Sequence, residues 1–281
     1  MNVGMRALCI AATASLIPLA TAAPIVLSGA GADAAAIQAT VDAFRAALGD
    51  PDNGSAPGSQ GAGRREVTWD EGGDAAPQEF FSGVPPMTTF VDRGSVFITL
   101  GPDAFVISGQ PDPEFGGINP SYPAIFQTFS SPRLFGILGF PAMFVVFTVP
   151  GTTPTQYPVN PPVVSSGFGA VFTDVDLANT TSLEYFDASG SSLGTYFVPT
   201  QNEGLSFLGV KFDDAIVASV IIRAGNASLF SEDGGDLDVV AMDNFIFGEP
   251  RAFVVHEPAT LVLLSVALLA LLWRREKRSE S

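Results

Sequence analysis

The stretch RLFGILGFPAMFVVFTV, residues 133–149, shows the pattern that decides the fold of this chain. It contains two apolar runs, Arg133–Leu138 and Ala142–Val149, and a Gly-Phe-Pro break lies between them. The first run contains Leu, Phe and Ile, and the second is rich in Val and Phe; Val, Ile and Phe favour strands, whereas Gly and Pro favour turns. The stretch therefore predicts two short β-strands joined by a turn.

The same alternation of short apolar runs and turn residues continues from Arg64 to Phe247. In Leu193–Val198, the residues Leu193, Thr195 and Phe197 recur with the period of two that a half-buried strand requires. Many short strands separated by Pro and Gly turns predict a mainly β protein, a β-sandwich or jelly roll. The remaining predicted strands are Glu66–Trp69, Thr88–Val91, Ser95–Leu100, Ala104–Ser108, Ile125–Phe129, Gly169–Thr173, Ser182–Phe186, Ser206–Phe212, Val217–Arg223 and Asp238–Phe247.

The aromatic content predicts a dry core between two sheets. The chain has 23 Phe but only 4 Tyr and 2 Trp, and Phe has no polar atom that needs a partner. We expect one sandwich domain over residues 64–253. Two smaller sandwiches divided near Pro150–Pro162 are the alternative, less favoured because each half would hold about six or seven strands and bury less of its surface.

A short helix is predicted before the strands, over Ala32–Leu48. Apolar residues recur there on a single face, and Gly49 is a stop signal. The following residues, Asp50–Gly63, are rich in Gly, Pro, Ser and Asn and predict a surface loop, so residues 23–63 form an N-terminal helix and loop. The apolar face consists of Ile37, Val41, Phe44 and Leu48.

The first 22 residues predict a cleaved signal peptide. Arg6 precedes an apolar segment, Ala7–Ala20, and Ala20-Thr21-Ala22 supplies the small residues that signal peptidase requires. We expect cleavage after Ala22 and therefore export of the body. An uncleaved N-terminal anchor is the alternative.

Residues 254–281 have three ordered parts that predict a sorting and membrane-retention tail. A polar motif comes first, an apolar run over 261–273 follows, and a basic cluster ends the chain. The run predicts a short transmembrane helix, and the basic residues are expected to stay on the cytoplasmic side. A C-terminal core helix of a soluble domain is the alternative. The motif is His256, Glu257, Pro258, Ala259 and Thr260, and the basic residues are Arg274, Arg275, Lys277 and Arg278.

This order of motif, apolar helix and arginine cluster resembles the PEP-CTERM sorting signal of bacterial exported proteins. His256 stands where that motif has its first proline, whereas Glu257 and Pro258 match it. The resemblance implies recognition by an exosortase-like membrane protease, in addition to signal peptidase. It also implies passage through the inner membrane and a final place at the cell surface or in the extracellular matrix.

The composition of the body excludes several kinds of site. It contains neither cysteine nor histidine, so disulfides, Ser-His-Asp or Cys-His catalysis and a Cys/His zinc site are ruled out. The chain has 13 basic and 29 acidic residues. Without Arg6 and the four basic and two acidic residues that follow Trp273, 8 basic and 27 acidic residues remain, a net charge of −19. Such a body should repel nucleic acid.

Three segments of the body also resemble other exported PEP-CTERM proteins: Gly167–Asp176, Leu205–Val210 and Ala241–Phe247. The last of these is similar to the final strand of jelly-roll carbohydrate-binding modules. In those modules the acidic residue of that strand, here Asp243, often helps to hold a structural calcium ion.

A calcium site is the first candidate site. Asp174 and Asp176 are two residues apart, so an extended backbone places both carboxylates on one face. Asn179 and Asp243 would add oxygen ligands, which calcium requires in number. Capping of turns is the alternative role for these residues. A second acidic stretch, Glu232–Asp238, is Gly-rich and lacks the EF-hand order, which favours a solvated loop.

Two further hypotheses concern saccharides. Tyr122 and Tyr157 lie in Pro-rich segments where their rings could be exposed to stack on sugars, whereas Trp69 is more typical of a core residue. A glycosidase would need two carboxylates at a fixed separation, but nothing in the local sequence singles out a pair, so an enzyme is not expected. We predict a binding or structural component, with a calcium-stabilised carbohydrate-binding module as the alternative. The available glutamates are Glu79, Glu114, Glu184 and Glu203.

Overall fold

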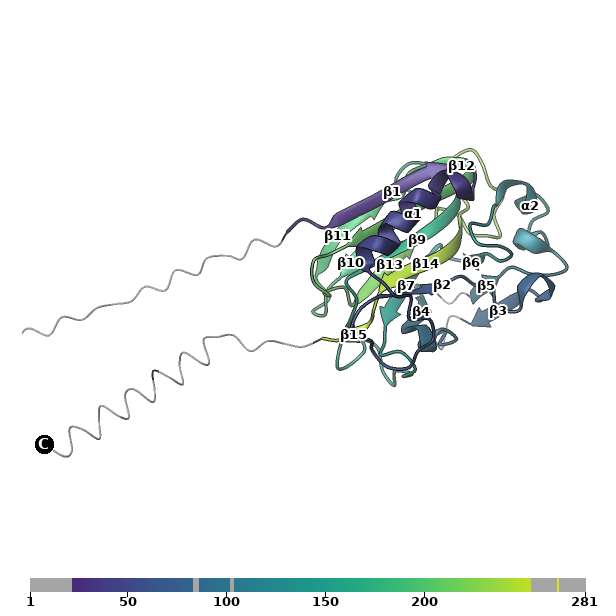
Figure 1. Cartoon of the computed structure of the whole chain (residues 1–281). Coiled ribbons are helices and arrows are strands. Elements are labelled where there is room, and N and C mark those ends of the chain that lie inside the picture. Colours follow the sequence, from purple (N-terminus) through teal and green to yellow (C-terminus); the bar gives the residue numbers. More distant parts are fainter. Residues whose placement is uncertain (1–21, 83–85, 102–103, 254–266, 268–281) are drawn as a thin grey trace, which may run out of the picture.

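The computed structural model describes residues 22–82, 86–101, 104–253 and 267 (Figure 1). The predicted signal peptide, the sorting motif, the apolar run 261–273 and the basic cluster therefore lie outside the described residues, apart from positions 22 and 267. Among the described residues, none of the helices combines the length and the apolar character needed to cross a membrane. The body is mainly β and consists of two large sheets packed face to face, which confirms the sandwich-like fold.

The larger sheet has eight strands in the order β1-β12-β9-β14-β6-β5-β3, and β2 also pairs with β14. Its neighbouring strands are antiparallel. The strands are β1 (Ile25–Gly31), β2 (Arg64–Val67), β3 (Glu79–Ser82), β5 (Ala104–Ile107), β6 (Phe135–Ile137), β9 (Gly167–Val175), β12 (Gln201–Lys211) and β14 (Ala241–Gly248).

The smaller sheet has five antiparallel strands in the order β11-β10-β13-β7-β4. Strands from both sides of residues 150–162 share each sheet, as in the pairing of β7 with β13, so the described body forms one sandwich. The strands are β4 (Ser95–Thr99), β7 (Ala142–Phe147), β10 (Ser182–Phe186), β11 (Ser192–Phe197) and β13 (Ser219–Arg223), and a separate pair joins β8 (Val163–Val164) to β15 (Arg251–Ala252).

Aromatic side chains fill the space between the two sheets, as the excess of Phe over Tyr and Trp predicts. Trp69 lies at the centre, where its ring stacks on Phe135 with 4.0 Å between the centroids. Phe90 and Phe245 meet the same indole edge-on at 5.0 Å. The indole N–H donates to the carbonyl of Asp243, so the one polar atom of this cluster has a partner. Trp69 is thus a core residue.

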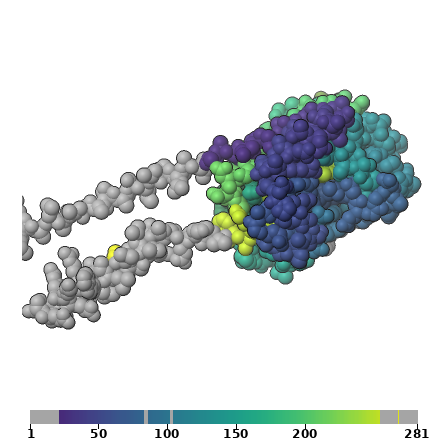
Figure 2. All heavy atoms as spheres, in the orientation of Figure 1, coloured from purple at the N-terminus to yellow at the C-terminus, as the bar shows by residue number. Residues whose placement is uncertain are grey.

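Helix α1 (Ala34–Leu48) covers the outer face of the larger sheet, across β1, β12 and β9 (Figures 1 and 2). The helix begins two residues later than predicted because the Asp33 side chain accepts a hydrogen bond from the Ala36 N–H and caps it. All four residues of the predicted apolar face are buried. They pack against Val171, Leu205, Phe207 and Ile246 of the sheet.

A second apolar cluster lies on the same outer face, beside β5 and β6. Short helical turns cover it: α2 (Tyr122–Ile125) and a 3-10 turn, Pro113–Phe115. Residues 226–240 add Leu229 and Val239 to this cluster. The Tyr122 hydroxyl lies 2.9 Å from the carbonyl oxygens of both Leu229 and Ser231 and shares its single proton between them, which ties the covering segments together.

Two predicted strands are wrong. Thr88–Val91 runs into a 3-10 turn, Val91–Arg93, which ends at Gly94 with φ +86°. Ile125–Phe129 overlaps the end of α2, whose first turn holds a proline. Conversely, β1 and β3 were not predicted, because four of the seven residues of Ile25–Gly31 are Gly, Ala or Ser and β3 has only four residues.

The predicted surface loop Asp50–Gly63 is held against the body by a buried ion pair. Arg65 and Glu249 are paired in two parallel contacts of 2.8 Å, and their side chains are 0% and 5% exposed. Arg65 also donates to the carbonyls of Gly54 and Gly58, and Glu249 accepts from the Gln60 N–H. The Arg65 and Glu249 side chains therefore hold the loop against the body through hydrogen bonds to its backbone.

Candidate cation site

Two of the predicted ligands, Asp174 and Asp176, lie where β9 ends. Asp174 is the penultimate residue of the strand and has φ +65°, a left-handed conformation that costs energy for a non-glycine residue. The pairing of β12 with β9 is irregular at this point, between Gln201 and Leu205. This irregularity brings the Glu203 N–H to 2.7 Å from the Asp174 Oδ1 atom.

The third member of the site is Asp233, from the acidic stretch predicted to be a solvated loop. That stretch connects β13 to β14 and folds back on itself through mutual backbone hydrogen bonds between Gly234 and Leu237. The Asp233 Oδ1 atom accepts from the Val239 N–H at 3.0 Å, which fixes the side chain. The loop thereby places a carboxylate opposite the end of β9.

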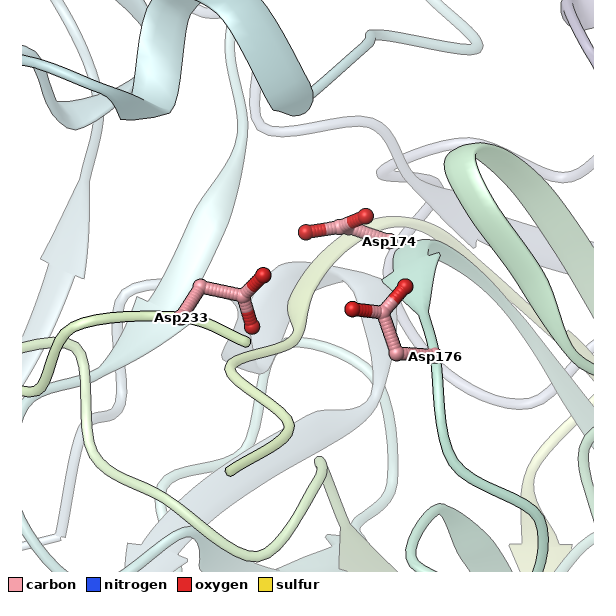
Figure 3. Close-up of side chains that lie close together, drawn as sticks. All are labelled: Asp174, Asp176 and Asp233. Carbon is pink, nitrogen blue, oxygen red and sulfur yellow. The ribbon is translucent and has the colours of Figure 1, made fainter. Parts of the chain in front are cut away.

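The three carboxyl groups face one another (Figure 3). One oxygen from each of Asp174, Asp176 and Asp233 can be chosen so that all lie within 4.8 Å of one another. Asp174 is fully buried, and its Oδ2 atom has no hydrogen-bond partner. The Oδ1 atom of Asp176 is also buried without a partner. Unpartnered buried oxygens are costly and rare in folded proteins, so these two oxygens are candidates for ligand atoms.

The electrostatics agree with the geometry. Burial raises the pKa of Asp174 to about 7, and the neighbouring carboxylates Asp176 and Asp233 add to the increase. Burial, again with repulsion from Asp233, raises the pKa of Asp176 to about 6. Above about pH 7, where Asp174 and Asp176 are ionised, the folded protein therefore holds mutually repelling negative charges at this point.

Asp238 fixes the turn that follows β9 and carries Asp176. Its Oδ1 atom accepts from the Asp176 N–H at 2.9 Å, and its Oδ2 atom accepts from the Thr180 hydroxyl. Burial raises the pKa of Asp238 as well, although these hydrogen bonds oppose the increase. Its oxygens are thus occupied in holding the turn after β9.

The other two predicted ligands do not join this cluster. Asn179 is exposed in the following turn with φ +69°, a conformation that asparagine tolerates, so it fits the alternative role of a turn residue. Asp243 is buried elsewhere, where its Oδ2 atom accepts from the N–H groups of Phe129 and Ser130. Burial raises its pKa well above the usual range, against those hydrogen bonds.

Comparisons with known proteins add no family. The chain matches no protein-family model, no curated protein and no solved structure.

Three converging carboxylates suit a hard divalent cation. Calcium is bound by oxygen ligands, mostly carboxylates and carbonyls, in flexible geometry. A cation would neutralise the repulsion among Asp174, Asp176 and Asp233 and satisfy the two unpartnered oxygens. From their spacing, the sequence predicted Asp174 and Asp176 as ligands. It missed the role of Asp233, although the acidic Gly-rich run around it was the available indication.

The aromatic candidates have different positions. Tyr122 is buried, so the prediction of an exposed ring there is wrong. Its hydroxyl lies within hydrogen-bond distance of the Leu229 and Ser231 carbonyls, and Phe126 packs on its ring with 4.6 Å between the centroids. Tyr157 is half-buried and lines a groove of about 460 Å³ with Ile98 and Phe144 on the outer face of the smaller sheet.

The four glutamates considered for a glycosidase lie on four different elements. Glu79 belongs to β3 and pairs with Arg133 at 3.0 Å. Glu184 belongs to β10 and accepts from Ser192, and Glu203 lies in β12. Glu114 lies in a 3-10 turn, where burial raises its pKa. Their dispersal gives the two-carboxylate hypothesis no support.

Proposed function

We propose that this chain is an exported cell-envelope or extracellular-matrix protein, a binding or structural component whose β-sandwich body takes up a divalent cation. The observation that supports the cation is the pair of buried, unpartnered oxygens on Asp174 and Asp176 opposite Asp233. The sequence supports export and C-terminal sorting through its two apolar ends and through the resemblance to the PEP-CTERM signal.

The cation is proposed to act as a structural clamp. It would join the end of β9 to the loop between β13 and β14, two segments about 57 residues apart in sequence. Only the folded protein holds these carboxylates together, so binding stabilises the fold by mass action. Calcium is the expected ion because all of the available ligands are oxygen atoms.

The test is thermal unfolding of the full chain in mild detergent, with either a chelator or calcium present. At a calcium concentration of about 100 times Kd, the expected stabilisation is about 2.7 kcal/mol. For a body of this size that corresponds to an increase in Tm of roughly 5–10 °C. Asp233→Asn should abolish the increase, whereas the exposed Asp214→Asn should keep it. An unchanged Tm of the wild-type chain at about 100 mM calcium, which is about 100 times the weakest Kd expected for such a site, would refute the cation site.

Export and sorting need a separate test in cells. An epitope tag placed in the exposed turn at Ser189 and Gly190, which joins β10 to β11, avoids the cation loop and the anchored Asp50–Gly63 loop. Fractionation should place the tagged body outside the cytosol. The mass of the tagged chain should be lower when an exosortase-like protease is present, because that protease would remove the tail. Recovery of the full-length chain in the cytosol of a host with an intact export pathway would refute this part.

A further inference from the structure

Two exposed phenylalanines border one groove at the edge of the larger sheet. Phe80 of β3 is 61% exposed, and Phe230, in the loop after β13, is 70% exposed. These are the largest exposures of any large apolar side chain in the described part of the chain. Both residues line the same groove of about 450 Å³, a volume typical of small-ligand sites.

The position of this groove follows from the fold. β3 is the last strand of the larger sheet, and the second apolar cluster covers the outer face only as far as β5. Phe80 pairs in register with Val106, a member of that cluster, so its ring lies on the covered face but beyond the cover. Phe230 comes directly after Leu229, which is buried in the cluster. The two exposed rings therefore lie at the border of the segments that cover this face of the sheet.

The rest of the lining is mixed. Pro111 and Ile118 are apolar, whereas Gln78, Gln110 and Asp112 are polar. The backbones of Gln78 and Gln110 are hydrogen-bonded, the Gln78 N–H to the Gln110 carbonyl at 3.3 Å and the Gln110 N–H to the Ala76 carbonyl at 2.8 Å. Their side-chain amides form no hydrogen bond within the described residues. Preformed backbone with free amides is what a ligand that forms hydrogen bonds requires.

The chemistry of the lining selects among ligand classes. The lining contains no basic residue, and the chain has a net charge of −16, so an anionic ligand would be repelled. A simple cation would meet a single carboxylate in this lining, that of Asp112. A purely apolar ligand would not use the hydrogen-bonding groups of the two amides and of Asp112.

We propose that this groove binds a neutral polysaccharide. Sugar rings offer C–H faces to the Phe80 and Phe230 rings and hydroxyls that both donate and accept, which matches the amides and the carboxylate. The groove uses none of the carboxylates of the cation site, so this inference goes beyond that site.

The test is affinity electrophoresis of the full chain in mild detergent, through gels that contain dextran, galactomannan or a mixed-linkage glucan. Alginate serves as the anionic comparison. The wild-type chain should be retarded by at least one neutral polymer and not by alginate. Phe80→Ala and Phe230→Ala should each weaken the interaction about tenfold or more, a change of ~1.4 kcal/mol or more. Phe197→Ala removes a ring that is 51% exposed on β11 of the other sheet, and it should bind as wild type does.

Three outcomes would overturn the proposal. In the first, the wild type is not retarded by any neutral polymer; in the second, both groove variants bind as the wild type does; in the third, alginate alone retards the chain. Self-association that Phe80→Ala abolishes, without saccharide binding, would show that a second copy occupies the groove. If either phenylalanine variant has a lowered Tm, Gln110→Ala provides the same test. Running each gel with calcium and with a chelator separates this outcome from that of the cation site.

Discussion

The substitution Asp174→Asn should stabilise the cation-free protein and at the same time remove its response to calcium. In the absence of a cation, the buried carboxylate repels Asp176 and Asp233 and has one oxygen without a partner. An asparagine keeps an oxygen to accept from the Glu203 N–H and offers an N–H₂ group where the unpartnered oxygen was. It therefore donates to the neighbouring carboxylates in place of repelling them.

The magnitude follows from the raised pKa of Asp174. The value rises from 3.8 in a model peptide to about 7 in the folded protein. Since each pKa unit corresponds to ~1.4 kcal/mol, ionisation costs the folded state up to about 4 kcal/mol. A folded-state pKa above the unfolded value means that stability is complete at low pH and is lost as the pH rises from about 4 to about 7. Asn should recover most of that loss at pH 8.

The assay is a Tm series between pH 5 and pH 8 in chelator, followed by the same series with calcium. In chelator, the wild-type Tm should fall as the pH rises, and the Asp174→Asn Tm should fall less and exceed it by about 5 °C or more at pH 8. Calcium should raise only the wild-type Tm. Asp214→Asn is the exposed control. A variant that is less stable than wild type in chelator at pH 8 would refute the argument that the Asp174 carboxylate is repelled by its neighbours.

Two further predictions concern the body. Glu249→Ala leaves the buried Arg65 guanidinium without its carboxylate and should cost about 3–5 kcal/mol in urea unfolding, whereas the exposed Glu71→Ala should leave the unfolding midpoint unchanged. Gly209→Ala places a Cβ atom 2.7 Å from the buried Phe44 ring, so it should push α1 off the sheet and lower the free energy of unfolding by about 1–3 kcal/mol. Gly61 has open space around it, so Gly61→Ala should have no effect. Equal urea midpoints for the two glycine variants would contradict the packing argument.

Much of the fold was predictable because it depends on local patterns. Helix α1 shows its buried face through the spacing of four apolar residues, and β10 was predicted with its observed bounds, Ser182–Phe186. The failures have physical causes. β1 is rich in small residues and becomes a strand only because β12 offers it a partner along seven residues. Ile125–Phe129 has strand-like residues, but the preceding Pro123 and the tertiary contacts of Tyr122 turn its beginning into a helix.

The cation site was only half predictable for a related reason. Asp174 and Asp176 are neighbours on one strand, so their spacing could be used. Asp233 arrives from a loop more than fifty residues later, and no local pattern states which strand end that loop will face. The same holds for the groove: the exposure of Phe80 depends on where the covering layer of the second cluster ends, and single residues in a Phe-rich chain do not reveal this.

The two halves of the proposed function are physically connected. A site of three carboxylates, of which two have a pKa raised to about 6 or 7, must lose protons to bind a cation, so its affinity at neutral pH should be modest. Calcium sites of extracellular modules have Kd values of about 10⁻⁴–10⁻³ M, a range that suits a calcium-rich exterior and leaves a site empty in the cytosol. The body would then be less stable before export than after it, because the carboxylate repulsion is relieved only outside. Lower stability inside the cell and stabilisation by calcium outside would suit the proposed export of this chain. Measured Kd values in the micromolar range or below would break this connection while leaving the site itself intact.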